Sequence, residues 1–291
     1  MPDIKILVVE QEDRKIPKHP LLYPIQTGTV LSSKVMQDVL HDNKGDNISD
    51  RNPYYCELTA IYWAWKNLKA DYIGLMHYRR YLSFRPMQIR KADGFVHFDL
   101  LDQKTLGRMG YQPDRMARMI SSVDLVTMKP ISIRMMSAWA VNTVRQQYAG
   151  SKEHDAADLE HAVDILLSMY PDYEEDVERY LNGGKGWFCN LFIMRRSLFD
   201  AYCQWLFPIL YQLYAEHYGE HQSEYARRFI GFVAERLFGI FVIHSIRVNK
   251  ELKIRYTSPV LIGEGFRFFP WAVGVTSFYL SKVLRKMHIN N

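Results

Sequence analysis

The residues best suited to chemistry stand together at the end of one short apolar run. Residues 72–76 are apolar, and His77, Arg79 and Arg80 follow directly. A short apolar run bounded by polar residues is typical of a buried strand in an α/β sheet, and ligands of such sheets bind beyond the carboxyl ends of the strands. Because a guanidinium offers paired donors and keeps its charge, Arg79 and Arg80 are placed to hold a phosphate-bearing ligand, with His77 nearby. Alternatively, both cover a sheet edge or pair with an Asp-rich loop.

Three further titratable residues are candidates for proton transfer. Glu235 stands in an apolar helical stretch, where loss of solvation would raise the pKa of its carboxyl toward that of a useful general base. The alternative is a structural ion pair with Arg236. His154 and Asp158 are four residues apart and would share one helix face, as a reserve base or as ligands of a second substrate. A solvated helix start is the commoner explanation of that pair.

Two polar positions are candidates for ligand binding. Asn190 lies in a predicted strand over residues 187–194, and a buried amide there needs a partner, either the backbone or a ligand hydroxyl. Asp46 belongs to a polar loop over residues 41–53 and could contact a nucleobase, a ribose or a metal ion. The spacing of its acids fits no calcium loop, and most such residues only form loops.

The elements that must position these residues follow from the apolar pattern. Strands are predicted over residues 4–9, 72–76 and 123–128, and Asn52 followed by Pro53 begins a helix that runs over residues 54–68. This order predicts the beginning of a βαβ-type, doubly wound α/β architecture, in which helices flank a mostly parallel central sheet. Residues 84–119 are expected to form loops and short helices. Further helices are predicted over residues 136–148, 155–169, 197–214 (kinked at Pro208) and 222–246.

The composition narrows the class of protein. The 291 residues suffice for one large domain, and 48% hydrophobic with 24% charged residues is a globular composition. The net charge of +5 suits an anionic small substrate or membrane surface, and no basic block or motif indicates nucleic-acid binding. The three cysteines form no CxxC pair, so neither a zinc site nor a disulfide framework is expected, and the default location is the cytoplasm.

The chain divides most simply into a domain over residues 1–262 and a tail over residues 263–291. The tail is aromatic and basic and resembles an interfacial membrane anchor, although packing against the domain or another subunit is the alternative. The first residues do not show the charged, apolar and cleavage regions of a signal peptide, so none is expected. The most apolar stretch, residues 229–246, is interrupted by Glu235 and Arg236, so a soluble or peripheral protein is expected.

Four segments resemble one bacterial family. Residues 52–67, 71–81, 187–210 and 231–237 are similar to capsular or exopolysaccharide synthesis proteins, a family long of unknown function that includes galactofuranosyl- and hexosyltransferases. The resemblance covers roughly residues 3–260. It implies a nucleotide-sugar-dependent glycosyltransferase of the GT-A type, with a single Rossmann-like α/β domain.

That resemblance implies roles for the residues above. Arg79 and Arg80, with His77, would hold the donor diphosphate, and Asp46 and Asn190 would be further donor contacts. Glu235 would be the base for an inverting attack. GT-A enzymes usually carry an Asp-x-Asp motif that binds manganese or magnesium, and this strand end has none, so no metal ligands are assigned.

The expected reaction is transfer of a hexose, most plausibly galactofuranose or galactose, from a UDP-sugar to a lipid-linked surface polysaccharide at the inner membrane. The competing class is a non-catalytic module that binds nucleotide sugars or carbohydrate. Hydrolysis of glycans would need two carboxylates about 5–10 Å apart, and no convincing pair is found. The oligomeric state is left open.

Overall fold

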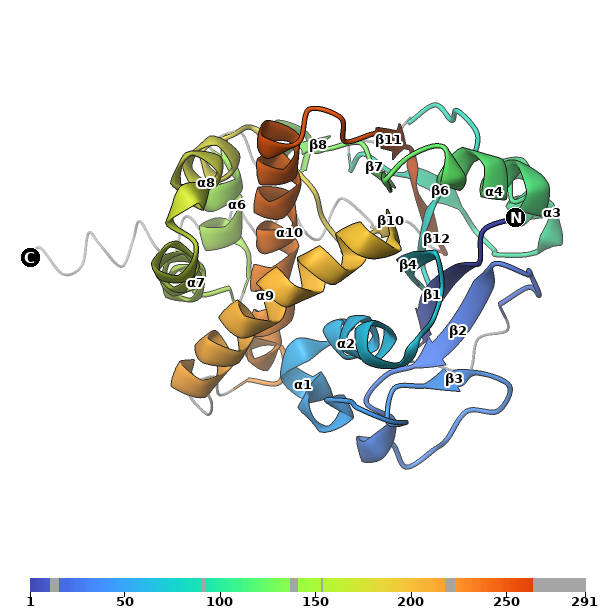
Figure 1. Ribbon diagram of the computed structural model, residues 1–291, viewed down its shortest axis with the longest axis horizontal. Coiled ribbons are helices and arrows are strands. Elements are labelled where there is room, and N and C mark those ends of the chain that lie inside the picture. Colours follow the sequence, from blue (N-terminus) through green and yellow to red (C-terminus); the bar gives the residue numbers. More distant parts are fainter. Residues whose placement is uncertain (11–15, 90–92, 137–140, 153, 218–222, 264–291) are drawn as a thin grey trace, which may run out of the picture.

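The computed structural model describes residues 1–10, 16–89, 93–136, 141–152, 154–217 and 223–263. A mixed α/β architecture, as predicted, places a mostly parallel sheet between layers of helices (Figure 1). The main path of the sheet runs β11-β7-β10-β4-β1-β2-β3. These strands are β1 (Ile4–Glu10), β2 (Leu22–Gln26), β3 (Leu40–His41), β4 (Tyr72–His77), β7 (Leu125–Met128), β10 (Phe192–Arg195) and β11 (Ile254–Thr257).

Shorter strands extend one part of the sheet. β12 (Pro259–Ile262) pairs with β5 (Arg80–Leu82) and β6 (Val96–Phe98), and β5 also pairs with β4. A separate two-stranded ribbon consists of β8 (Ile131–Ser132) and β9 (Lys185–Gly186).

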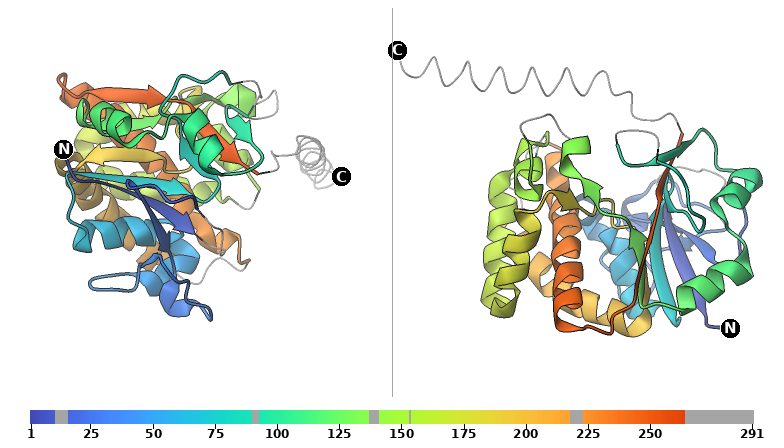
Figure 2. Two further views of the ribbon diagram at one scale, coloured as in Figure 1. Left: turned by 90° about the vertical axis from the view of Figure 1, so that its right-hand side faces the viewer. Right: turned by 90° about the horizontal axis from the view of Figure 1, so that it is seen from above.

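Helices cover both faces of the sheet (Figure 2). On one side α2, α9 and α10 form the inner layer, and α6, α7 and α8 pack outside α9 and α10; α3 and α4 lie on the other side. Their bounds are α1 (Asn52–Tyr55), α2 (Leu58–Asn67), α3 (Gln103–Met109), α4 (Pro113–Ser121), α5 (Ile133–Met136), α6 (Val144–Gly150), α7 (Ala156–Met169), α8 (Glu174–Leu181), α9 (Arg196–His217) and α10 (Phe229–Val248).

The direction of one central strand decides where the candidate residues meet. All six residues of β4 are buried, and β1 runs parallel to it. β10 runs antiparallel to β4, with Phe192 opposite Leu75. The segment that leads into β10 therefore lies beside the carboxyl end of β4, where His77 stands.

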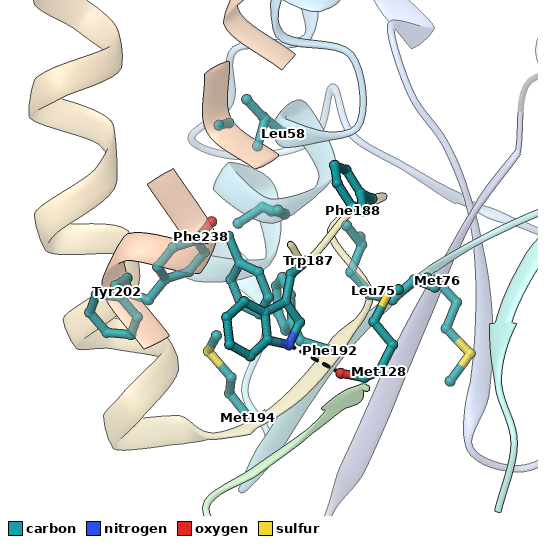
Figure 3. Packing of buried hydrophobic residues seen from close by; sticks show 14 of the residues in the cluster. Leu58, Leu75, Met76, Met128, Trp187, Phe188, Phe192, Met194, Tyr202 and Phe238 are labelled. Atoms are coloured by element: carbon teal, nitrogen blue, oxygen red, sulfur yellow. Dashed lines mark hydrogen bonds between the residues drawn. The ribbon is translucent and has the colours of Figure 1, made fainter. Parts of the chain in front are cut away.

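Large aromatic side chains fill the space between the sheet and the helices. Figure 3 shows Trp187 and Phe192 packed with Tyr202 and Phe238 of the helical layer. The indole N–H of Trp187 donates a hydrogen bond of 3.1 Å to the carbonyl of Met128. This bond satisfies a buried polar group and fixes the ring against the end of β7.

Several predicted elements agree with the structure. The strands predicted over 4–9, 72–76 and 123–128 correspond to β1, β4 and β7, and the helix predicted over 155–169 is α7. α9 continues through Pro208 from Arg196 to His217.

Other boundaries were wrong. The helix predicted over 54–68 is interrupted at Cys56, whose φ of 51° is left-handed. Only Phe192–Arg195 of the segment 187–194 is a strand, since Cys189 and Asn190 have φ of 69° and 46° and form a turn. The helix predicted over 136–148 begins at Val144, after the N-cap Thr143. The helix predicted from 222 begins at Phe229. Apolar periodicity does not register such backbone turns.

One helical segment, Ala226–Val248, is long and apolar enough by composition to cross a membrane, with 72% of its apolar window buried inside the protein. Such burial is what the central helix of a folded domain shows. The tail that was expected to contact a membrane or a subunit lies, from residue 264 on, outside the described residues.

Candidate active site

Two turns with left-handed backbone meet at the carboxyl end of β4. One turn contains Cys56, between α1 and α2, and the other contains Cys189 and Asn190, before β10. The amide of Asn190 joins them by donating a hydrogen bond of 2.8 Å to Glu57. A non-glycine residue in this region is strained unless its surroundings hold it, and such strain gathers at functional sites. We refer to His77, Arg80, Glu57, Asn190 and Glu235 as the carboxyl-end cluster.

His77 is fixed on one side of this cluster. Its Nε2 lies 2.6 Å from the carbonyl oxygen of Cys189, which requires the ring nitrogen to carry the proton and donate it. Burial is the largest influence on the ring and lowers its pKa, with the nearby positive charge of Arg80 acting in the same direction. His77 is therefore neutral at pH 7, and its Nδ1 can accept a hydrogen bond.

Glu235 projects from α10 into the same cluster. One carboxylate oxygen accepts the N–H of Cys189 at 3.0 Å, and the other accepts a hydrogen bond of 3.0 Å from Arg236. The side chain keeps 20% of its surface exposed. Burial is the largest influence on the carboxyl and raises its pKa, and the charge of Glu57 acts in the same direction. Since each carboxylate oxygen has two lone pairs, Glu235 retains capacity to accept a proton from a ligand.

The other contacts of Arg236 lie outside the carboxyl-end cluster. Its guanidinium is 2% exposed, and it donates to Phe232 and Gln147 at 3.0 and 2.7 Å and lies over the ring of Tyr148. Glu235 is therefore ion-paired with Arg236, as the alternative interpretation predicted, and its carboxylate also faces the carboxyl-end cluster.

The side chains of the adjacent residues Arg79 and Arg80 have different surroundings. Arg80 belongs to β5, and its positive charge interacts with the carboxylates of Glu235 and Glu57. Arg79 points toward β12, where its Nε donates a long hydrogen bond of 3.4 Å to the carbonyl of Ile262. Arg79 lies in the turn between β4 and β5, whereas Arg80 is the first residue of β5, so the two side chains take different directions.

His154 and Asp158 do not share a helix face as predicted. α7 begins at Ala156 with Asp155 as its N-cap, so His154 precedes the helix. The His154 ring stacks on Phe232 at 4.2 Å, at the flank of the cluster, and burial lowers its pKa to about 3. A group with so low a pKa is a poor proton acceptor at neutral pH. Asp158 is buried in the first turn of α7.

Asp46 lies at the other end of α2. Its carboxylate accepts the hydroxyl of Tyr62 at 3.0 Å, and its backbone bonds to Asn67, the last residue of that helix. Glu57 stands just before the first residue of α2. The length of a ten-residue helix, about 15 Å, therefore separates Asp46 from the cluster.

Glu57 was missed by reasoning from the sequence alone. Its position just after Cys56 looked like the interior of one continuous helix, and the left-handed Cys56 turns the chain so that Glu57 meets Asn190. Arg228 was also missed; its Nε lies 3.3 Å from the sulfur of Cys56. Asn52 and Pro53 marked only where the helix begins, and no residue type in the sequence marked its interruption at Cys56.

The described residues contain no group of three or more His, Cys, Asp or Glu side chains that could hold a metal ion. The donors gathered here are guanidinium, imidazole and amide groups with two carboxylates. They suit recognition of an anion and a hydroxyl better than chelation of a cation.

Comparison with known proteins gives two matches. The model of a family described as Domain of unknown function (DUF4422) matches residues 5–246. The solved apo structure of the bifunctional glycosyltransferase WbbM superimposes with a TM-score of 0.84 and 29% identity. The match covers 90% of this chain and 46% of that chain, so this chain spans about half the length of the WbbM chain. No curated protein matches the chain.

Proposed function

The chain belongs to the DUF4422 family, and from that premise we propose that it is a glycosyltransferase that uses a nucleotide sugar. The likeness to WbbM, a glycosyltransferase, supports the reaction class. The observation that carries the proposal is the meeting of Arg80 and Glu235, a cation and a carboxylate of raised pKa, at the carboxyl end of β4.

The proposed chemistry divides between these two groups. The carboxylate of Glu235 removes the proton of an acceptor hydroxyl, and the oxygen attacks the anomeric carbon of the donor sugar. The bond between that carbon and the diphosphate oxygen breaks, and the nucleoside diphosphate leaves with the electron pair. Arg80 stabilises the charge that develops on it. Attack opposite to the leaving group inverts the anomeric centre.

The other members of the cluster orient the sugar. His77 offers a neutral ring nitrogen as an acceptor. The side-chain oxygen of Asn190 is buried and has no hydrogen-bond partner among the described residues, so it can accept a sugar hydroxyl. In this proposal Glu57 holds the Asn190 amide in place through their 2.8 Å hydrogen bond.

We further propose a UDP-hexose donor, with galactofuranose or galactose favoured, and a lipid-linked glycan acceptor reached from the cytoplasmic face of the inner membrane. This part rests on the resemblance of residues 52–67 and 71–81 to exopolysaccharide hexosyltransferases.

The test compares UDP binding and sugar transfer in two variants. Arg80→Gln removes a charged hydrogen bond worth about 1.5–3 kcal/mol, so UDP affinity should fall about 10- to 150-fold in calorimetry. Glu235→Gln should bind UDP almost normally and lose about 10²–10⁴-fold in UDP release from UDP-galactose or UDP-galactofuranose with an acceptor supplied. Each measurement is made with manganese and with a chelator.

The control is Arg115→Gln, which removes one positive charge from the exposed surface of α4. Its UDP affinity should match the unaltered protein. Arg79→Gln should have a smaller effect than Arg80→Gln, because Arg79 bonds to Ile262. If Arg80→Gln bound UDP and turned over as the unaltered protein does, the site assignment would fail. Tight UDP binding with no transfer to any acceptor would favour the non-catalytic binding module.

A further inference from the structure

A cavity that contains none of the carboxyl-end cluster residues lies between α8, α10 and the β8–β9 ribbon. It has a volume of about 540 Å³ and is lined by Arg134, Arg179, Lys185, Tyr180, Trp187 and Ile243, among others. Part of its wall is the glycine-rich turn that joins α8 to β9, at residues 183–185. Three cations from three separate elements thus face one hollow of the size that holds a small ligand.

The charge of this cavity is not compensated. The lining residues that the structure describes include three basic side chains and no carboxylate. Arg179 and Lys185 form no side-chain hydrogen bond or ion pair with any described residue, and Arg134 bonds only to the neutral Asn142 at 2.9 Å. Glu178, next to Arg179 on α8, is engaged elsewhere through Arg145. All three basic residues are exposed to solvent, so an anion with several oxygens can reach their donors.

Close packing holds the glycine turn in place. A side chain at Gly183 would collide with the carbonyl of Arg179, and one at Gly184 would meet the carbonyl of Asn142 at 3.4 Å. Glycine at these positions lets the turn pack closely on the backbone of α8 and of Asn142, and this packing fixes one wall of the cavity.

One face of α10 connects the cavity to the candidate base. Glu235, Gly239 and Ile243 are spaced by four residues and therefore lie along one side of the helix. Tyr180 packs directly on Gly239, and its hydroxyl accepts the N–H of Trp187 at 3.2 Å. Eight residues of helix span about 12 Å, so the cavity lies one to two sugar units from the carboxylate of Glu235.

We propose that this cavity binds a phosphate or diphosphate ester group of the acceptor substrate. The inference rests on the proposed function, because it places the second substrate relative to Glu235. The same chemistry is present in the donor diphosphate, and the separation of about 12 Å along α10 from Glu235 assigns the cavity to the acceptor instead.

The test uses pyrophosphate as the probe and the full chain saturated with UDP, so that the donor site is filled. We expect calorimetry to show pyrophosphate binding that weakens at least tenfold in the double variant Arg179→Gln/Lys185→Gln. The UDP affinity of that variant should stay within about twofold of the unaltered protein. A matched control, Lys104→Gln/Arg115→Gln, removes the same two charge types from exposed positions on α3 and α4. Its pyrophosphate affinity should not change.

Three results would overturn the proposal. The first is no pyrophosphate binding by the UDP-saturated protein, and the second is equal weakening in the control. The third is a parallel loss of UDP affinity in Arg179→Gln/Lys185→Gln, which would place the donor diphosphate in this cavity. Failure of the proposed function gives a different result from failure of this inference. It would appear as normal UDP binding and turnover in Arg80→Gln, whereas pyrophosphate binding in the cavity would be intact. If UDP does not bind at all, the same variants are compared without it.

Discussion

Replacement of Arg236 by methionine tests whether the ion pair sets the proton affinity of Glu235. Arg236 is 2% exposed and supplies the one cation that bonds directly to the Glu235 carboxylate, at 3.0 Å, among the described residues. Methionine keeps much of the volume and removes the charge. The carboxylate is then left with the N–H of Cys189 and the more distant charge of Arg80.

The Arg236→Met substitution should lower the stability of the fold and raise the pKa of Glu235. Breaking a buried ion pair costs about 3–5 kcal/mol, and the lower end applies because Glu235 keeps 20% exposure. The pKa of Glu235, already raised from 4.5 by burial, should rise further when its partner is lost. Because the base acts in its ionised form, the acid limb of kcat/KM should move to higher pH.

Urea denaturation and pH profiles of UDP release measure these effects. The double variant Glu235→Gln/Arg236→Met should be less destabilised than the sum of the two single variants, by about 1–2 kcal/mol. In the unaltered protein, the stability that Glu235 contributes relative to Glu235→Gln should be greatest below pH 4.5 and disappear as the pH rises through the raised pKa. Additive single effects together with an unmoved acid limb would refute this account.

Three further predictions concern the frame around the site. Gly239→Ala would place a methyl group on the Tyr180 ring, so we expect a loss of about 1–3 kcal/mol of unfolding free energy in urea melts; unchanged stability would mean that α8 is free to shift. His154 has a pKa lowered from 6.5 to about 3, so its contribution to stability is complete above pH 6.5 and is lost as the pH falls toward 3. The variant His154→Gln should flatten the stability profile in that window, and an identical profile would contradict the assignment. Asp176→Asn removes a fully buried carboxylate that bonds to His244 at 2.7 Å, and should cost about 3 kcal/mol, read as a lower melting temperature; no change would show that this contact between α8 and α10 is dispensable.

The sequence by itself determined the class of fold and the strand that carries the site. Residues 72–76 are a short continuous apolar run, which is typical of a strand buried on both faces, and the polar residues that follow mark its carboxyl end. The apolar stretch around Glu235 indicated a buried carboxylate for a similar reason, since a helix that is apolar all round must be covered.

Only the tertiary structure decided which polar side chains meet. The turns at Cys56 and Cys189 bring Glu57 and Asn190 together, although 133 residues separate them in the chain. Periodicity reports which faces are apolar, whereas a left-handed turn re-aims a side chain without changing that pattern. The same limit explains Asp46, whose residue type suited ligand binding and whose hydrogen bonds place it at the far end of α2. Local residue pattern indicates which segments become helices and strands, and the packing of distant segments decides which polar side chains meet.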